Sequence, residues 1–119
     1  MDSIKRIDER TIDISLVTFI YKEDDQFICL SPGLQIAGYG DNEDEAINSF
    51  KITIEDFVHD SLKFERLENV LFSLGWKYDQ NESCGELDGK HYERIKSTYS
   101  GIPESGSMYA FHQQFAAVA

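Results

Sequence analysis

Four carboxylates occupy a stretch of five residues near the middle of the chain: Asp41, Glu43, Asp44 and Glu45. Carboxylates at this density can cap the amino end of a helix, hold a metal ion, or accept hydrogen bonds from the lysines and arginines of a partner. Asp41 and Asn42 are both good N-cap residues, and Asp44 or Glu45 follows three positions later, as in a capping box. We therefore expect a helix to begin here, with carboxylates at its positively polarised end.

A metal site would need a further carboxylate from another element, and Asp13 is the candidate. Together with Asp41 or Glu45, it would form the kind of carboxylate cluster that metal-dependent nucleases use. However, Asp13 lies in a stretch where polar and apolar residues alternate, so its side chain is expected to face solvent. Because residues 41–45 already have a capping role, we expect no metal, no cofactor and no catalytic residue.

The remaining reactive side chains are three histidines and two cysteines: His59, His91, His112, Cys29 and Cys84. The histidines have no metal ligand or nucleophile at a recognised spacing, so we expect surface or packing roles. The cysteines show no CxxC spacing, and the sequence predicts neither a disulfide nor a zinc site. Residues 38–40, Gly-Tyr-Gly, begin like a dinucleotide-binding loop, but Glu43 stands where the third glycine should be.

Three strands are expected before the helix. Residues 11–21 alternate and carry apolar side chains on both faces near their end, which predicts an interior strand. A polar break at residues 22–25 predicts a hairpin into a second strand at residues 26–30, which Pro32 and Gly33 end. A short third strand is expected at residues 34–39. The helix then carries an apolar stripe at helical spacing: Ile47, Phe50, Ile54, Phe57 and Val58.

The second half of the chain is less regular. A second helix is expected at about residues 63–74, with Gly75 as its stop and Trp76 folding back on Leu71. The rest divides into a loop at residues 79–89, a strand or helix at 90–99, a loop at 100–107, and a strand, or alternatively a short helix, at 108–118.

These elements predict an α+β fold, in which a small mixed or antiparallel sheet with a β-β-β-α core carries helices on one face. The 119 residues are expected to form one domain, with a core module at about residues 11–60 and a second helix and irregular tail at about residues 61–119. No apolar run is long enough to span a bilayer, and the first residues lack an apolar signal core. We therefore expect a cytoplasmic protein with no membrane partner.

The net charge of −11 is concentrated in one part of the chain, because residues 23–60 hold ten acidic residues and one lysine. Such a field repels phosphate backbones and attracts basic partners, mainly by speeding their encounter. The alternative to a partner-binding role is that these carboxylates form a solvated surface that keeps the protein soluble. Residues 90–119 carry only three cations, Lys90, Arg94 and Lys96. The sequence therefore does not favour direct DNA binding.

The order of features across residues 27–58 resembles the HicB antitoxin family, the immunity half of the HicA–HicB type II toxin–antitoxin pairs. In that family a strand runs into a proline, a short strand ends in Gly-Asp, and a helix opens with Glu-Ala. Here Pro32, residues 40–41 and residues 45–46 hold these places. The resemblance implies a partial RNase H-like fold that has lost its catalytic carboxylates. Many HicB proteins also append a DNA-binding helical module, and no second helix of basic character is visible here.

By this resemblance, the chain would be a non-catalytic antitoxin that neutralises a small basic HicA-like toxin, a ribonuclease that cleaves mRNA. The acidic surface around Asp41, Glu43, Asp44 and Glu45 would dock on the toxin and replace RNA phosphates at its lysines and arginines. An edge left open by the short third strand would also favour homo-oligomers, most simply a homodimer. Two alternatives stay open: an orphan HicB-like protein-interaction module with another partner, and a metal-dependent RNase H-like nuclease.

Overall fold

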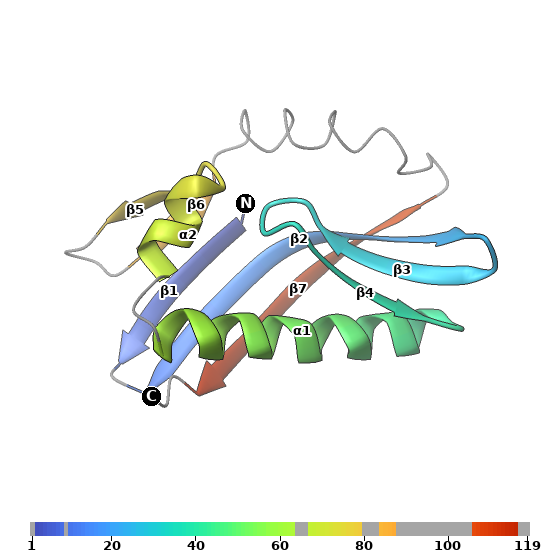
Figure 1. The fold of residues 1–119 in the computed structure, drawn as a ribbon, viewed down its shortest axis with the longest axis horizontal. Coiled ribbons are helices and arrows are strands. Elements are labelled where there is room, and N and C mark those ends of the chain that lie inside the picture. The colour runs from blue at the N-terminus through green and yellow to red at the C-terminus, as the bar shows by residue number, and fades with distance from the viewer. Residues whose placement is uncertain (1, 9, 64–66, 80–83, 88–105, 117–119) are drawn as a thin grey trace.

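A computed structural model describes residues 2–8, 10–63, 67–79, 84–87 and 106–116 of the chain. Its elements run in the order β1 (Asp2–Asp8), β2 (Thr11–Glu23), β3 (Gln26–Ser31), β4 (Ile36–Gly40), α1 (Glu43–Lys63), α2 (Leu67–Ser73), β5 (Lys77–Asp79), β6 (Cys84–Leu87) and β7 (Ser107–Ala116) (Figure 1). The strands form one seven-stranded sheet, and each pairing among the described residues is antiparallel. The predicted α+β class with an antiparallel sheet is thus confirmed.

The long strand β2 organises the sheet. Its first half, residues 11–15, pairs with β1, and its second half, residues 19–23, pairs with β3. The last strand, β7, pairs with residues 11–20 of β2, which overlap both of these stretches. Because a strand has only two edges, β7 must lie on the edge opposite β1 and β3. The remaining strands extend the sheet outward, giving the path β4-β3-β2-β1-β6-β5 with β7 beside β2.

The alternation of β2 has the expected effect on burial. Ile12, Ile14 and Leu16 are buried on the face toward α1, and near the end of the strand both Phe19 and Ile20 are buried. The interior strand predicted from residues 11–21 is therefore confirmed. It turns into β3 through Asp24 and Asp25, both with positive φ, which is the two-residue hairpin geometry that matches strand twist.

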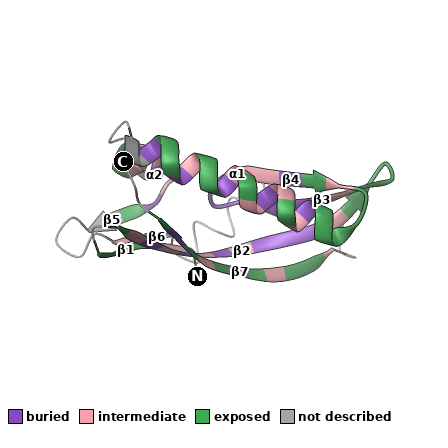
Figure 2. Cartoon of the chain, turned by 90° about the horizontal axis from the view of Figure 1, so that it is seen from below, coloured by how far each residue is buried: buried purple, intermediate pink, exposed green. Residues whose placement is uncertain are grey.

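Helix α1 covers one face of the sheet (Figure 2). Its buried side consists of Ala46, Phe50, Ile54 and Val58, and the ring of Phe50 meets Phe111 of β7 edge-on at 5.2 Å between centroids. Burying a side chain of this size contributes about 1.5–3 kcal/mol. The predicted apolar stripe is confirmed, since Phe50, Ile54 and Val58 are buried and Ile47 and Phe57 are partly buried at its margins.

The short helix α2 lies on the same side of the sheet and ends as predicted. Gly75 has a φ of 89°, its N–H donates to the carbonyl of Phe72, and the N–H of Trp76 donates to the carbonyl of Leu71 at 2.9 Å. This pair of bonds is the Schellman end, which requires a left-handed residue after the helix. The indole N–H of Trp76 then donates to the carbonyl of Gly33 at 2.9 Å, which ties α2 to the turn before β4.

Three expectations about the elements need correction. Residues 2–8 form β1, a strand that the sequence did not suggest, because its charged residues hide the alternation. Residues 84–87 form β6 and pair with β5 and β1, so this part of the predicted loop at residues 79–89 is a strand. The third strand begins at Ile36, because Leu34 is buried in the preceding turn and Gln35 has a positive φ.

The C-terminal strand was the preferred prediction for residues 108–118, and it is confirmed as β7. Tyr109, Phe111 and Phe115 share the face toward α1, where Phe111 and Phe115 are buried. The segment at residues 90–99, and residues 100–105 of the loop predicted at residues 100–107, lie outside the described residues, while Ser107 at the end of that predicted loop already belongs to β7.

Candidate protein-binding surface

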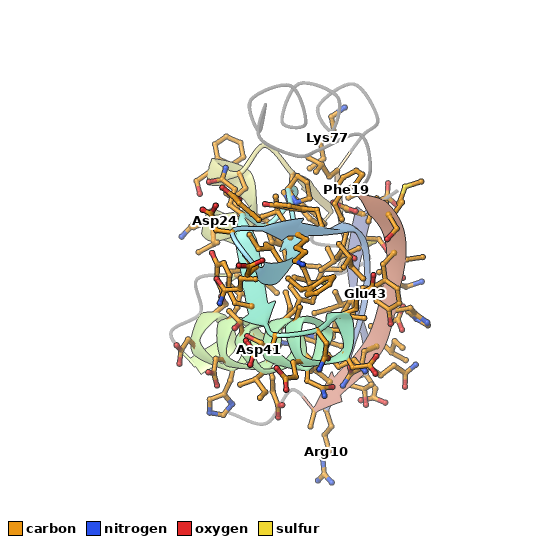
Figure 3. The ribbon with its side chains drawn as sticks, turned by 90° about the vertical axis from the view of Figure 1, so that its right-hand side faces the viewer. Arg10, Phe19, Asp24, Asp41, Glu43 and Lys77 are labelled. Carbon is orange, nitrogen blue, oxygen red and sulfur yellow. The ribbon has the colours of Figure 1, made fainter. Side chains whose placement is uncertain are left out.

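Two acidic segments that are separated in the sequence meet at one end of the molecule. The register pairs Lys22 with Phe27, and Phe27 with Gly40, so the β2–β3 turn and the start of α1 lie at the same end of the sheet. Figure 3 looks at this end and labels Asp24, Asp41 and Glu43. We call it the acidic end, and it consists of seven exposed carboxylates: Glu23, Asp24, Asp25, Asp41, Glu43, Asp44 and Glu45.

The start of α1 is held by a reciprocal cap. The side-chain Oδ1 of Asn42 accepts a hydrogen bond from the N–H of Glu45 at 2.9 Å, and Oε2 of Glu45 accepts one from the N–H of Asp41 at 2.8 Å. Between the two predicted caps, the structure therefore selects Asn42, with Glu45 as its partner. Glu43 and Asp44 lie exposed in the first turn, where the positively polarised helix end favours carboxylates, and they take no part in this cap.

The position of this helix end depends on two glycines of β4. A Cβ atom on Gly38 would overlap the backbone nitrogen of Phe50 and approach the carbonyl of Ala46, and one on Gly40 would overlap Glu45. In addition, the N–H of Tyr39 donates to Oγ of Ser49 on α1 at 3.1 Å. The Gly-Tyr-Gly sequence thus serves close packing between strand and helix, which accounts for it without a nucleotide.

The sequence candidates for metal chemistry do not come together. Asp13 faces away from α1 and meets His112 of β7, with 2.6 Å between Oδ1 and Nε2. Asp41 and Glu45 belong to the acidic end instead. Among the described residues, no group of three or more His, Cys, Asp and Glu side chains is arranged to hold a metal ion. His59 lies on the exposed side of α1, and His91 falls outside the described residues.

The two cysteines are separate thiols. Cys29 is fully buried in β3, and burial raises the pKa of its thiol to about 11 because the thiolate loses hydration. Such a thiol stays protonated and behaves as a small apolar group, as expected from its place in a strand. Cys84 lies in β6 and is half-buried.

The structure contains a buried carboxyl, that of Asp2, which the sequence did not indicate. Asp2 is only 2% exposed, its Oδ1 accepts a hydrogen bond from the N–H of Val17 at 2.7 Å, and no partner for Oδ2 is found in the described part of the chain. It fills the gap on the edge of β2 between the stretch paired with β1 and the stretch paired with β3. Loss of hydration raises the pKa of this carboxyl above its usual value of 3.8. No local pattern marks it, since its burial follows from strand pairing.

A groove between α1 and β7 was also not foreseen. Its walls are Glu55, Asp56, Val58 and His59 from the second half of α1, and Phe115 and Ala116 from the end of β7. On the helical side Glu55, Asp56 and His59 are exposed while Val58 is buried, and the strand side is apolar. The apolar stripe of α1 and the alternation of β7 are visible in the sequence, but their contact is not.

No family model, no curated protein and no solved structure matches this chain. No helix among the described residues is both long enough and apolar enough to cross a membrane.

Proposed function

We propose that this chain is a non-catalytic binding protein for a small basic protein, and that it acts as a HicB-like antitoxin against a basic ribonuclease that cleaves mRNA. The observation that carries the proposal is the acidic end, where two separate acidic segments converge on one exposed surface. The resemblance of residues 27–58 to HicB proteins and the α+β sheet with helices on one face support a partial RNase H-like fold as part of the same proposal.

The mechanism follows from the charges. A ribonuclease binds RNA through lysines and arginines, and carboxylates can replace the phosphates at those side chains. Exposed carboxylates contribute mainly to the rate of encounter, because each surface ion pair adds at most about 1 kcal/mol in water. The cap at Asn42 and Glu45 and the packing of Gly38 beneath α1 fix the backbone at the start of the helix, so little backbone conformational entropy is lost there on docking.

The first test is capture of partners from the cytoplasm of cells that produce the protein, followed by their identification by mass. We expect a small basic protein in a 1:1 or other fixed ratio, and we expect the complex to suppress RNA cleavage by that protein. Recovery of a fixed-ratio partner that is neither basic nor a ribonuclease would favour the orphan interaction module. Recovery of the chain alone as an oligomer would contradict the antitoxin proposal.

The second test locates the surface. Glu43→Lys and Asp44→Lys together should lower the association rate constant for the captured partner about tenfold at low salt, with a smaller effect at high salt. Glu86→Lys, a single charge reversal at another exposed position on β6 remote from the acidic end, is compared with Glu43→Lys alone as the matched control and should have little effect. If Glu86→Lys slows association as much as Glu43→Lys alone does, binding depends on net charge and not on the acidic end.

A further inference from the structure

Among the residues that the structure describes, the strand β7 leaves one long edge of the sheet unpaired. It runs beside β2 for ten consecutive residue pairs, from Thr11 with Ala116 to Ile20 with Ser107, without a register shift. Within the described residues, β7 pairs with no other strand (Figure 1). In an antiparallel strand, alternate residues direct both N–H and C=O away from the first neighbour, so about half of the backbone groups of β7 point outward.

The other two outer strands are protected in ways that β7 is not. The outer N–H of Tyr39 on β4 is bonded to Ser49 of α1, and helix α1 packs directly on this strand. The strand β5 is only three residues long and carries Lys77 and Asp79. Natural edges are usually shortened, charged, bulged or covered to prevent pairing. The ten residues of β7 include no proline, lysine, arginine, aspartate or glutamate, and its register with β2 has no bulge, so this edge is not protected by short length, charge or a bulge.

The surroundings of this edge indicate the charge of what would pair with it. The groove beside the second half of β7 is lined on its α1 side by Glu55 and Asp56 and on its strand side by Phe115. An added strand would direct every second side chain toward α1 and the others toward the open face of the sheet. Basic side chains on the α1 side would meet the two carboxylates, while acidic ones would be repelled.

We propose that the open edge of β7 binds an extended, basic segment of the protein partner as an additional antiparallel or parallel strand. This inference rests on the proposed function and assigns a second contact to the same basic partner. The acidic end speeds the encounter, and the backbone hydrogen bonds at β7 slow dissociation. A second copy of this chain is a poorer occupant, because both copies carry a net charge of −11 and would bring their own Glu55 and Asp56 to one seam.

The test uses defined peptides and the whole chain, so it does not depend on finding the natural partner. An eight-residue peptide of alternating lysine and valine is compared with a twin in which glutamate replaces lysine. With the lysine peptide, backbone amides of β7 that are not bonded to β2 should become protected from hydrogen exchange, while amides of α1 should not change. The proposal would be overturned if the lysine and glutamate peptides protected the β7 amides equally, or if the lysine peptide added no protection to them.

Two N-methylated forms of the lysine peptide separate strand pairing from simple charge attraction. One is methylated at the odd amides and the other at the even amides, so both keep the same charge. A paired strand directs only one of these sets toward β7. We expect one form to lose at least tenfold in affinity and the other to bind nearly as the unmethylated peptide does. Equal behaviour of the two forms would overturn strand addition.

Two pairs of variants distinguish failure of this inference from failure of the proposed function. Glu55→Lys with Asp56→Lys should raise the dissociation rate constant of the lysine peptide about tenfold. Glu43→Lys with Asp44→Lys should mainly slow its association and leave the exchange pattern of β7 unchanged. If Glu43→Lys with Asp44→Lys weakens binding of the captured partner and Glu55→Lys with Asp56→Lys does not, the acidic end is supported as a binding surface and the β7 site is contradicted. If the chain alone is a dimer with β7 already protected, a second copy occupies the edge and the inference is overturned.

Discussion

The carboxyl of Asp2 and the carboxylates of the acidic end are the same chemical group in opposite surroundings. Asp2 is buried against the edge of β2 with one oxygen bonded to Val17 and the other without a partner among the described residues. The seven side chains of the acidic end are exposed: one ends β2, two belong to the turn that follows, and four belong to a helix start or its cap. Solvation therefore separates a carboxyl that acts on stability from carboxylates that are available to a partner.

The acidic end depends on apolar and backbone packing behind it more than on its own charges. Gly38→Ala would place a methyl group against the backbone of α1, and the helix would have to move away from β4. We expect the free energy of unfolding to fall by about 3 kcal/mol or more, the largest effect among these variants. Urea unfolding measures this change. Tyr39→Ala, at the neighbouring half-exposed position on the other face, should cost clearly less, and an equal loss would contradict the role of close helix approach.

Asp2 should give the next largest effect, and its two substitutions should differ. Asp2→Ala removes the acceptor of the partly buried Val17 N–H, so we expect a loss of about 1–3 kcal/mol in the free energy of unfolding. Asp2→Asn keeps an oxygen that can accept this hydrogen bond and cannot ionise, so it should be closer to the wild type. If the two variants were equally unstable in urea unfolding at pH 5, the hydrogen bond would not be what Asp2 contributes.

The pH dependence of Asp2 has a definite sign. Because burial raises the pKa of Asp2 in the folded state, folding holds its proton more tightly than the unfolded chain does. The resulting stability is present at low pH and is lost as pH rises through the folded-state pKa. The free energy of unfolding of Asp2→Asn relative to wild type should therefore increase from about pH 4 upward and then level off. Urea unfolding of both proteins from about pH 4 upward measures this difference. A difference that stays constant or falls with pH would contradict the raised pKa of Asp2.

The cap at the acidic end should give the smallest change in stability. Asn42→Ala removes the bond to the N–H of Glu45, and we expect a loss of about 1 kcal/mol in the free energy of unfolding. Asn42→Asp keeps an acceptor at this position and serves as the control. Thermal unfolding of the two variants measures the difference. An Asn42→Asp variant as unstable as Asn42→Ala would show that the cap bond is not what holds this helix end.

Several elements could be predicted because their signals are local. The alternation of residues 11–21, the cap residues at 41–45 and the glycine at position 75 each specify backbone geometry within a few residues, and they appear as a strand, a helix start and a Schellman end. The strand β1 could not be recognised in the same way, because only Ile4 and Ile7 are apolar in its seven residues. Its pairing with β2 and β6 stabilises it as a strand, and both pairings join residues that are distant from one another in the chain or lie across a turn.

The candidate binding surface likewise combines features that the sequence predicts with features that only the fold produces. Residues 41–45 were identified from their composition and from the resemblance to HicB proteins, and they are exposed together at the start of α1. The contribution of residues 23–25 follows only from the β2–β3–β4 register, and the open edge of β7 follows only from which strands leave it unpaired. Local propensity and charge are properties of neighbouring residues, so the chain carries them without folding. Burial of Asp2, convergence of the two acidic segments and exposure of the β7 edge arise from contacts between distant segments, which exist only after strand pairing.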